Sequence, residues 1–220
     1  VLYEAMRVGA AGNTVLGTIH ADSAYSVGDR VVNDLRVPTT SFKATDLVVV
    51  ARPIRFSGSL KSFRRMTQIT EVKKHWSKDP DREGGLLDLL LYDARTDALE
   101  LIEDNLKESE LFERIRRISG LSLNQIWEEI RMLANSKLFL VELKNEHKVP
   151  ELLEGEYTTQ ARAKLALMKD IQIQEKGTPD YPKLLEEWKE WVRKNTLQAV
   201  LKKREQREQD KDAQDGNEEV

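Results

Sequence analysis

The sequence predicts an α/β fold followed by an α-helical region, and three observations support this prediction. Short runs of β-branched and apolar residues recur over residues 1–76, between segments of helical periodicity. The breaker-rich stretch "KDPDREGG" then interrupts that pattern. Further on, apolar residues recur at three- and four-residue steps, as in amphipathic helices. We therefore divide the chain into an α/β part, a β-hairpin, a helical region and a charged tail: 1–76, 77–107, 108–201 and 202–220.

The composition narrows the possible classes of protein. With 220 residues and 40% hydrophobic content, the chain can bury a substantial core. It lacks a run of about 18 apolar residues and a secretory leader, so we expect a cytoplasmic protein. The absence of cysteine excludes disulfides and thiolate metal sites. Lys and Arg (35) nearly balance Asp and Glu (38), although they outnumber them over residues 1–76.

The first predicted element is a helix over "LYEAMRVGAAGN", with Gly12 or Asn13 as its C-terminal stop. Because no N-cap residue precedes this helix, we expect residue 1 to lie inside a larger structural unit. The next segment, "TVLGTIHA", is predicted to be a short buried strand. Its residues Val15, Leu16 and Ile19 make both faces apolar, as expected in a parallel sheet covered by helices.

The next predicted elements alternate between helix and strand. Asp22 or Ser23 can cap a helix that runs to about Leu35, and Pro38 follows its end. The β-branched run Val48–Val50 in "FKATDLVVVARPI" and the alternating pattern of "RRMTQITEVKK" predict two strands. Two apolar arms around the polar "DARTDA" turn then predict a β-hairpin in "LLDLLLYDARTDALELI".

The rest of the chain is predicted to be helical. Ser109 can cap "ELFERIRRIS" and Gly120 can end it, while Ser122 and Gln125 have the spacing of a capping box for the following helix. Further helices are expected at roughly 157–176 and 181–201. Residues 202–220 have no apolar stripe, so we expect a frayed helix that passes into disorder.

The position of His20 indicates a candidate site. Ligands bind at the carboxyl ends of strands in open parallel sheets, and the next helix offers its N-terminal N–H groups to an anion. His20 lies between such a predicted strand and helix, where its imidazole could donate a hydrogen bond to a phosphate oxygen. The alternative is a structural histidine that bonds a backbone carbonyl.

The segment "RVGAAGNTVLGTIHADSAYSVGDRVVNDL", followed by "DLVVV" and "RRMTQITEV", resembles the C-terminal portion of the ATPase domain of type II/IV secretion-system ATPases. The resemblance is strongest to archaeal members that power pilus- or archaellum-like machines. It covers about residues 1–76, and "GTIHADSA" is similar to the family's histidine box. Residues 108–135 also resemble the helical region that follows this domain in archaeal members.

This resemblance implies a RecA-like fold and a homo-hexameric ring that hydrolyses ATP with Mg²⁺ to move pilins or secreted substrates. The ring would lie at the cytoplasmic face of the membrane, against a membrane platform protein. His20 would act as a sensor of the terminal phosphate, with Thr18 as its catalytic neighbour. Arg7 and Gly12, in or beside the Gly9–Gly12 stretch, would join His20 in nucleotide binding.

The sequence also departs from the family. It contains no G-x-x-x-x-G-K-[ST] phosphate loop, and the acidic motif that orients Mg²⁺ would precede residue 1. Phosphoryl transfer depends on those parts. We therefore expect ATP and Mg²⁺ to act in the full-length protein, and expect this chain alone neither to hydrolyse ATP nor to bind it tightly.

Two groups of residues have alternative interpretations. Four arginines could face a neighbouring subunit's nucleotide, or could form surface salt bridges: Arg52, Arg55, Arg64 and Arg65. Trp188 and Trp191 form an apolar stripe that serves either internal packing or the docking of a partner.

Two other functions remain as alternatives. One is a catalytically inactive interaction module. The other is nucleic-acid binding, because "RIRRISGLSLNQIWEEIRML" has the helix, turn and helix of a helix-turn-helix. Its second helix carries Glu128 and Glu129, which would repel phosphate, so we expect no nucleic-acid partner.

Overall fold

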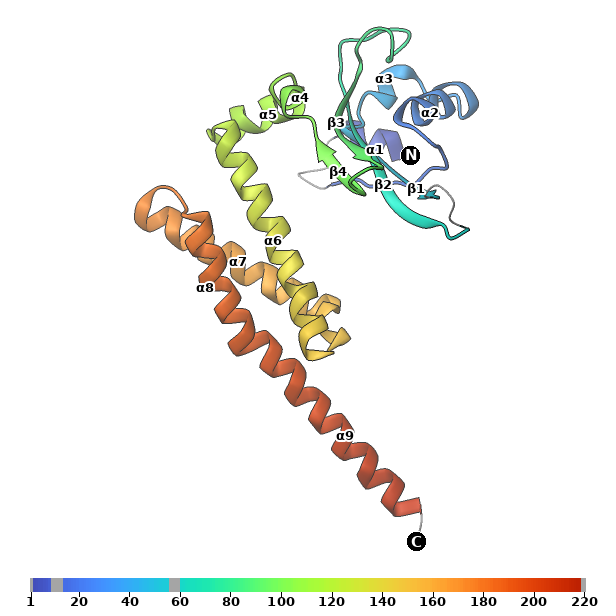
Figure 1. Ribbon diagram of the computed structural model, residues 1–220. Coiled ribbons are helices and arrows are strands. Elements are labelled where there is room, and N and C mark those ends of the chain that lie inside the picture. The colour runs from blue at the N-terminus through green and yellow to red at the C-terminus, as the bar shows by residue number, and fades with distance from the viewer. Residues whose placement is uncertain (1, 9–13, 56–59, 219–220) are drawn as a thin grey trace. The chain divides into compact units, whose positions relative to one another are not determined.

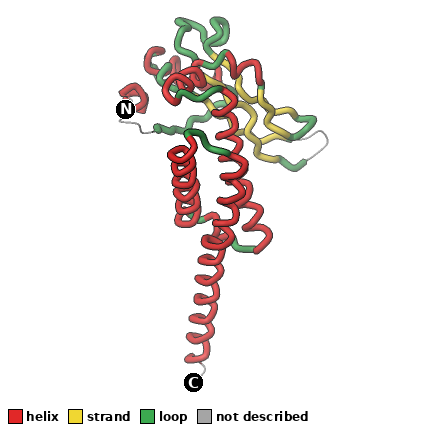
Figure 2. Tube along the Cα trace, turned by 90° about the vertical axis from the view of Figure 1, so that its left-hand side faces the viewer, coloured by secondary structure: helices red, strands yellow, loops and turns green. Residues whose placement is uncertain are grey.

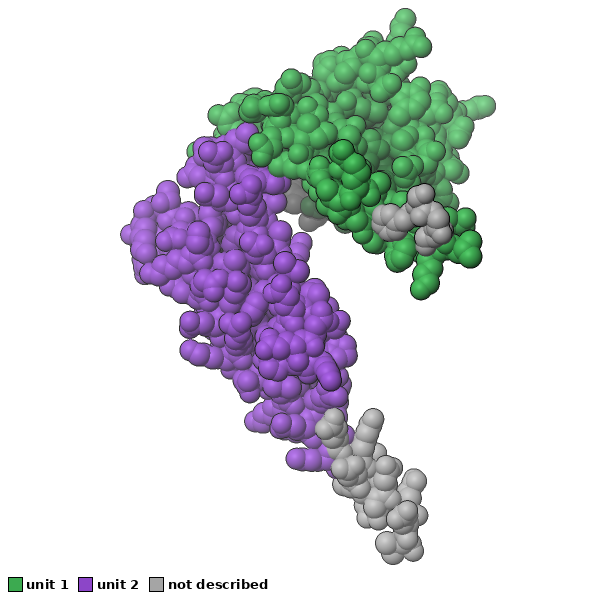
Figure 3. Space-filling model, viewed as in Figure 1, with its two compact units in different colours: residues 1–121 green, residues 122–220 purple. Residues whose placement is uncertain are grey.

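The computed structural model describes residues 2–8, 14–55 and 60–218, and it divides into two compact units (Figure 3). Unit 1 comprises residues 1–121 and contains all the described strands. Unit 2 comprises residues 122–220 and is helical over its described residues. Figure 1 labels the α-helices and strands of both units.

The sheet of unit 1 has four strands in the order β1-β2-β3-β4, drawn yellow in Figure 2. Every neighbouring pair is antiparallel, so the predicted parallel sheet was wrong. The two strands predicted around "DLVVV" and "RRMTQITEV" are confirmed, and so is the predicted β-hairpin. The strands are β1 (Leu47–Ile54), β2 (Phe63–Val72), β3 (Leu86–Asp93) and β4 (Ala98–Leu101).

Short helices accompany this sheet. The helix predicted after His20 is confirmed and continues into a π-helical segment, η2. Its N-cap is Ser23, whose hydroxyl oxygen accepts a hydrogen bond from the Ser26 N–H at 3.0 Å. The helices of unit 1 are α1 (Leu2–Val8), α2 (Ala24–Asp29), η2 (Arg30–Asp34), α3 (Thr39–Phe42), α4 (Glu103–Lys107) and α5 (Glu110–Ser119).

One core of unit 1 lies where α2 contacts β1 and β2. Alternate residues of β1, Val48 and Val50, are buried because successive side chains of a strand point to opposite faces. The rings of Phe42 and Trp76 pack edge to face with centroids 6.3 Å apart. The buried members of this cluster are Ala24, Val31, Phe42, Val48, Val50, Val72 and Trp76.

The predicted strand "TVLGTIHA" is not formed. Residues 14–21 belong to neither a helix nor a strand, and the side chain of Leu16 is 86% exposed. A strand needs a neighbour to satisfy its backbone N–H and C=O groups, and within the described residues β1 pairs only with β2. Residues 14–21 therefore have the apolar pattern of a strand, but among the described residues no neighbouring strand pairs with them.

Unit 2 begins with the predicted capping box. The Ser122 hydroxyl accepts from the Gln125 N–H, and the Gln125 side-chain oxygen accepts from the Ser122 N–H at 2.9 Å. The predicted helices around 157–176 and 181–201 are confirmed. The elements are α6 (Leu123–His147), η3 (Pro150–Leu153), α7 (Gly155–Lys176), α8 (Tyr181–Trp191), η4 (Val192–Leu197) and α9 (Gln198–Glu218).

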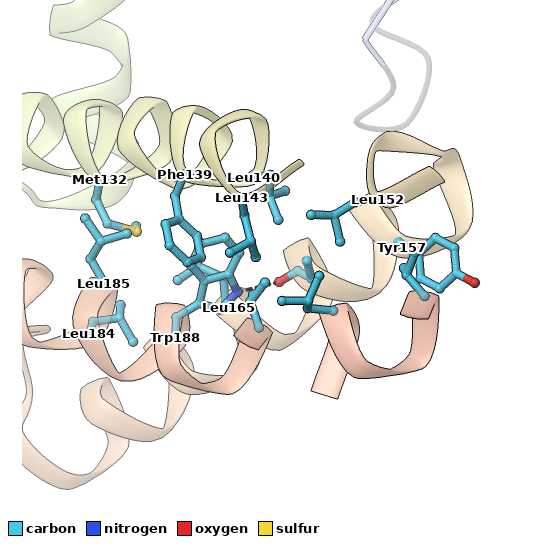
Figure 4. Packing of buried hydrophobic residues seen from close by; sticks show 14 of the residues in the cluster. Met132, Phe139, Leu140, Leu143, Leu152, Tyr157, Leu165, Leu184, Leu185 and Trp188 are labelled. Carbon is cyan, nitrogen blue, oxygen red and sulfur yellow. Dashed lines mark hydrogen bonds between the residues drawn. The ribbon is translucent and has the colours of Figure 1, made fainter. Parts of the chain in front are cut away.

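The core of unit 2 surrounds Trp188, whose side chain is 1% exposed (Figure 4). Its ring packs edge to face on Phe139 with the centroids 6.0 Å apart. Trp191 is partly buried and also packs against this cluster. The packing interpretation of the tryptophan pair is therefore confirmed.

Helix α9 continues to Glu218, through a segment that we expected to be disordered. Its sequence "LKKREQREQDKDAQ" consists mainly of strong helix formers, which accounts for the helical backbone. Among the residues of this helix whose burial is described, the buried Val200 and the partly buried Leu201 anchor its start.

Candidate functional site

His20 lies four residues before the start of α2, and its side chain is exposed. The Arg30 guanidinium donates a hydrogen bond to the backbone carbonyl oxygen of His20, with Nη1 2.8 Å from the oxygen. Over residues 14–55 and the other described parts, the His20 imidazole has no hydrogen-bond or ion-pair partner. The backbone of His20 is thus held by Arg30 of η2, while the imidazole ring is free to bind a ligand.

The start of α2 is already satisfied by protein groups. The Ala24 N–H donates to Gln68 Oε1 at 3.1 Å, and the Ser26 N–H is taken by Ser23. The Ser26 hydroxyl donates to Asp22 Oδ1 at 2.6 Å, and this bond is the main cause that lowers the pKa of Asp22. Two N–H groups of this helix start are thus used and the Asp22 carboxylate lies beside them, which disfavours an anion there. The candidate site there reduces to the His20 ring.

The other predicted site residues do not gather around His20. Thr18 is exposed on the same extended segment. Arg7 lies on α1, where its Nη1 atom is 3.4 Å from both Glu4 Oε1 and Ser41 Oγ. Gly12 and the rest of the Gly9–Gly12 stretch lie outside the described residues.

Of the four arginines considered for a subunit interface, Arg65 forms a surface ion pair with Asp97. Its Nε and Nη2 atoms lie 2.7 and 2.8 Å from the two carboxylate oxygens. This bidentate pair agrees with the salt-bridge interpretation for Arg65. The other three, Arg52, Arg55 and Arg64, are exposed.

A pocket that the sequence did not predict lies elsewhere in unit 1. Its volume is about 320 Å³, and we call it the basic pocket. Four of its residues are cationic and one is a carboxylate, and the lining comes from α1, α3, α5, the segment between α3 and β1, and the segment that follows β2. The lining residues are Met6, Arg7, Thr40, Lys43, Ala44, Asp46, Lys74 and Arg114.

A shared carboxylate organises the basic pocket. Asp46 Oδ1 is 2.9 Å from the Arg114 guanidinium and 3.4 Å from Lys74 Nζ. Lys74 Nζ also donates to the Thr45 carbonyl at 2.7 Å. Burial lowers the pKa of Lys74, and the negative charge of Asp46 partly offsets this effect. The pocket thus contains a partly desolvated ammonium group beside guanidinium groups.

No structural observation on the described residues supports the helix-turn-helix interpretation. Its first helix, α5, belongs to unit 1, and its second, α6, belongs to unit 2. Glu129 on α6 is already engaged, because its carboxylate lies 2.7 Å from Lys169 Nζ and accepts from the Tyr181 hydroxyl at 3.2 Å.

Over its described residues the chain is thus a mixed α/β protein with one four-stranded antiparallel sheet and a helical second unit. No protein-family model matches it, and none of the curated proteins matches its sequence. Across the part of the chain that the structure describes, no helix has the length and apolar character needed to cross a membrane. The same residues contain no group of three or more His, Asp or Glu that could hold a metal ion.

Proposed function

We propose that this chain is the C-terminal part of a hexameric, RecA-like secretion or pilus-assembly ATPase, in which His20 contacts the terminal phosphate of ATP. The proposal rests on the resemblance of "GTIHADSA" to the histidine box and on one structural observation. That observation is the exposed imidazole of His20, which has no partner among the described residues. A structural histidine would instead have its ring bonded to a backbone carbonyl.

In this proposal the chain's own residues position a hydrogen-bond donor. The Arg30 guanidinium fixes the backbone carbonyl of His20. The imidazole then donates a hydrogen bond to the terminal phosphate as negative charge redistributes during transfer. The sequence contains no G-x-x-x-x-G-K-[ST] motif, so the proposal assigns the phosphate loop and the Mg²⁺ ligands to other parts of the ATPase.

The test is the His20→Ala substitution in the ATPase polypeptide that contains this chain. Loss of one preorganised donor should lower turnover by about tenfold to a thousandfold. ADP affinity and the melting temperature should change far less. Turnover, melting temperature and ADP affinity are measured on the same preparation.

Ser23→Ala is the matched control, because it removes a cap three residues away without removing a donor to phosphate. It should cost about 1 kcal/mol of stability and leave turnover per folded hexamer nearly unchanged. If His20→Ala gave this same pattern, with normal turnover and a lowered melting temperature, His20 would be a structural residue and the proposal would be wrong.

A further inference from the structure

We propose that the basic pocket binds a phosphate group, at a site separate from His20. Neither His20 nor Thr18 lines this pocket. Its volume of about 320 Å³ falls at the lower end of the range typical of small-molecule sites. The inference does not depend on ATP hydrolysis, so it goes beyond the function proposed above.

The charge of the pocket favours an anion. Four cationic side chains face a single carboxylate, Asp46, and two of them, Lys74 and Arg114, share one oxygen atom of that carboxylate. The only ion pair of Arg7 within the described residues is a solvent-exposed contact with Glu4 at 3.4 Å, which holds the guanidinium weakly. The pocket therefore has positive charge that its own carboxylate does not neutralise.

The donors of the pocket are held in place from several sides. The Lys43 ammonium donates to the Trp76 carbonyl oxygen and lies 4.9 Å from the centroid of the Trp76 ring. Arg7 approaches the Ser41 hydroxyl. The Thr40 hydroxyl has no hydrogen-bond partner among the described residues and can donate to a ligand. An anion here would meet guanidinium, ammonium and hydroxyl donors together.

A phosphate group suits this set of donors better than a single carboxylate does. It carries up to two negative charges and three acceptor oxygens, and guanidinium groups bind it in a bidentate manner. Partial burial of Lys74 lowers its pKa, so a bound dianion would favour its charged form.

A neighbouring cavity of about 370 Å³ shows why the basic pocket is the preferred site. The two cavities share Asp46, Lys74 and Arg114. The neighbouring one adds Arg117 but also Glu71 and Glu110, so its formal charges balance. The excess of positive charge is therefore confined to the side that contains Arg7 and Lys43.

The test is calorimetric titration of the 220-residue chain with inorganic tripolyphosphate at low ionic strength. Arg7→Gln and Arg114→Gln should each weaken binding by about tenfold to a hundredfold, the effect of losing one charge-assisted hydrogen bond. The control is Arg95→Gln, which removes the same charge from an exposed turn paired with Asp93. It should leave the dissociation constant unchanged.

Arg114→Gln could destabilise α5 and weaken binding for that reason alone. Arg7→Gln does not have this problem, because Arg7 lies on the surface of α1. A second arm compares binding to phosphatidylglycerol and phosphatidylcholine vesicles. If the pocket variants bind tripolyphosphate more weakly than the unsubstituted chain but bind phosphatidylglycerol vesicles equally well, the ligand is a free phosphate. If they also bind phosphatidylglycerol vesicles more weakly, the ligand is a lipid headgroup. Equal weakening by all three substitutions, or no binding in either arm, would overturn the proposal.

The outcome is distinguishable from that of the His20 experiment. The two proposals are tested on different variants: Arg7→Gln and Arg114→Gln report tripolyphosphate binding by this chain, and His20→Ala reports turnover in the ATPase. If His20→Ala abolished tripolyphosphate binding while the pocket variants retained it, the phosphate would be assigned to His20 and the basic pocket would carry no site.

Discussion

The indole N–H of Trp188 donates a hydrogen bond to the backbone carbonyl oxygen of Ala161, with 2.8 Å between the two atoms (Figure 4). Both residues are buried, so the bond joins α8 to α7 inside the core of unit 2. It satisfies the one polar atom of a side chain that otherwise makes apolar contacts.

The Trp188→Ala variant should lose about 3–5 kcal/mol of unfolding free energy, because it removes the largest fully buried side chain of the core. Trp188→Phe should lose less, since it keeps an aromatic ring against Phe139 and removes only the indole N–H that donates to the Ala161 carbonyl. Urea unfolding measures both. Trp191→Ala serves as the comparison and should cost less than Trp188→Ala, because Trp191 is only partly buried.

Glu71 should be important for the stability of unit 1. Its carboxylate is 2% exposed and accepts hydrogen bonds from the Ser109 hydroxyl and from the Leu111 N–H at 2.7 Å, which ties β2 to the start of α5. Glu71→Ala should cost about 1.5–3 kcal/mol for each lost bond to a charged group. Glu71→Gln, which keeps one acceptor oxygen, should cost less.

The control for Glu71 is Glu113→Ala on α5, whose exposed carboxylate pairs with Arg116 one turn away. It should change the unfolding free energy by no more than about 0.5 kcal/mol. Equal effects of Glu71→Ala and Glu113→Ala in thermal unfolding would contradict the structural role assigned to Glu71.

The turn of the β3–β4 hairpin should contribute stability that depends on pH. Hydrogen bonds from Arg65 and Tyr92 lower the pKa of Asp97 from 3.8 to about 2. Since the folded pKa lies below the unfolded one, the contribution is complete above 3.8 and is lost as the pH falls towards 2.

The Asp97→Asn variant measures this contribution, because Asn tolerates the left-handed backbone at this position, where φ is 51°. The melting temperatures of the two proteins should differ at neutral pH and converge as the pH falls through this window. A difference that stays constant down to pH 2 would rule out the linkage.

The charged part of α9 should exchange its amide hydrogens quickly. Beyond residue 202 the helix has few apolar side chains to pack, and a helix without tertiary packing is marginal in water. The buried segment around Leu184 and Leu197 should be protected instead. Hydrogen exchange followed by mass spectrometry compares the two segments, and equal protection would show that the tail is anchored by contacts we have not assigned.

Local signals in the sequence predicted the local structure well. The Ser23 cap, the Gly120 stop and the capping box at Ser122 each act within a few residues, and all three are present. Strand direction and pairing depend on segments far apart in the chain. Such long-range pairing cannot be read from local signals. The predictions of a parallel sheet and of a buried Leu16 are therefore both wrong.

The same reasoning applies to the candidate sites. His20 was identified because its signal is local, namely its place just before a helix start. The basic pocket was missed because Arg7, Lys43, Lys74 and Arg114 are widely separated in the sequence and meet only in the folded unit. An excess of Lys and Arg over residues 1–76 was the one available signal, and it did not indicate where those charges converge.

The helix caps at the junction between the two units bear on how gene fusion or fission could separate or recombine the units. Gly120 ends α5 with a left-handed backbone, where φ is 71°, and donates its N–H to the Arg116 carbonyl, while Ser122 begins the capping box of α6. Each helix end is thus completed by residues on its own side of the Leu121–Ser122 peptide bond. Gene fusion or fission at this bond would separate the units into two genes, or join either one to a new neighbour, without leaving a helix end uncapped.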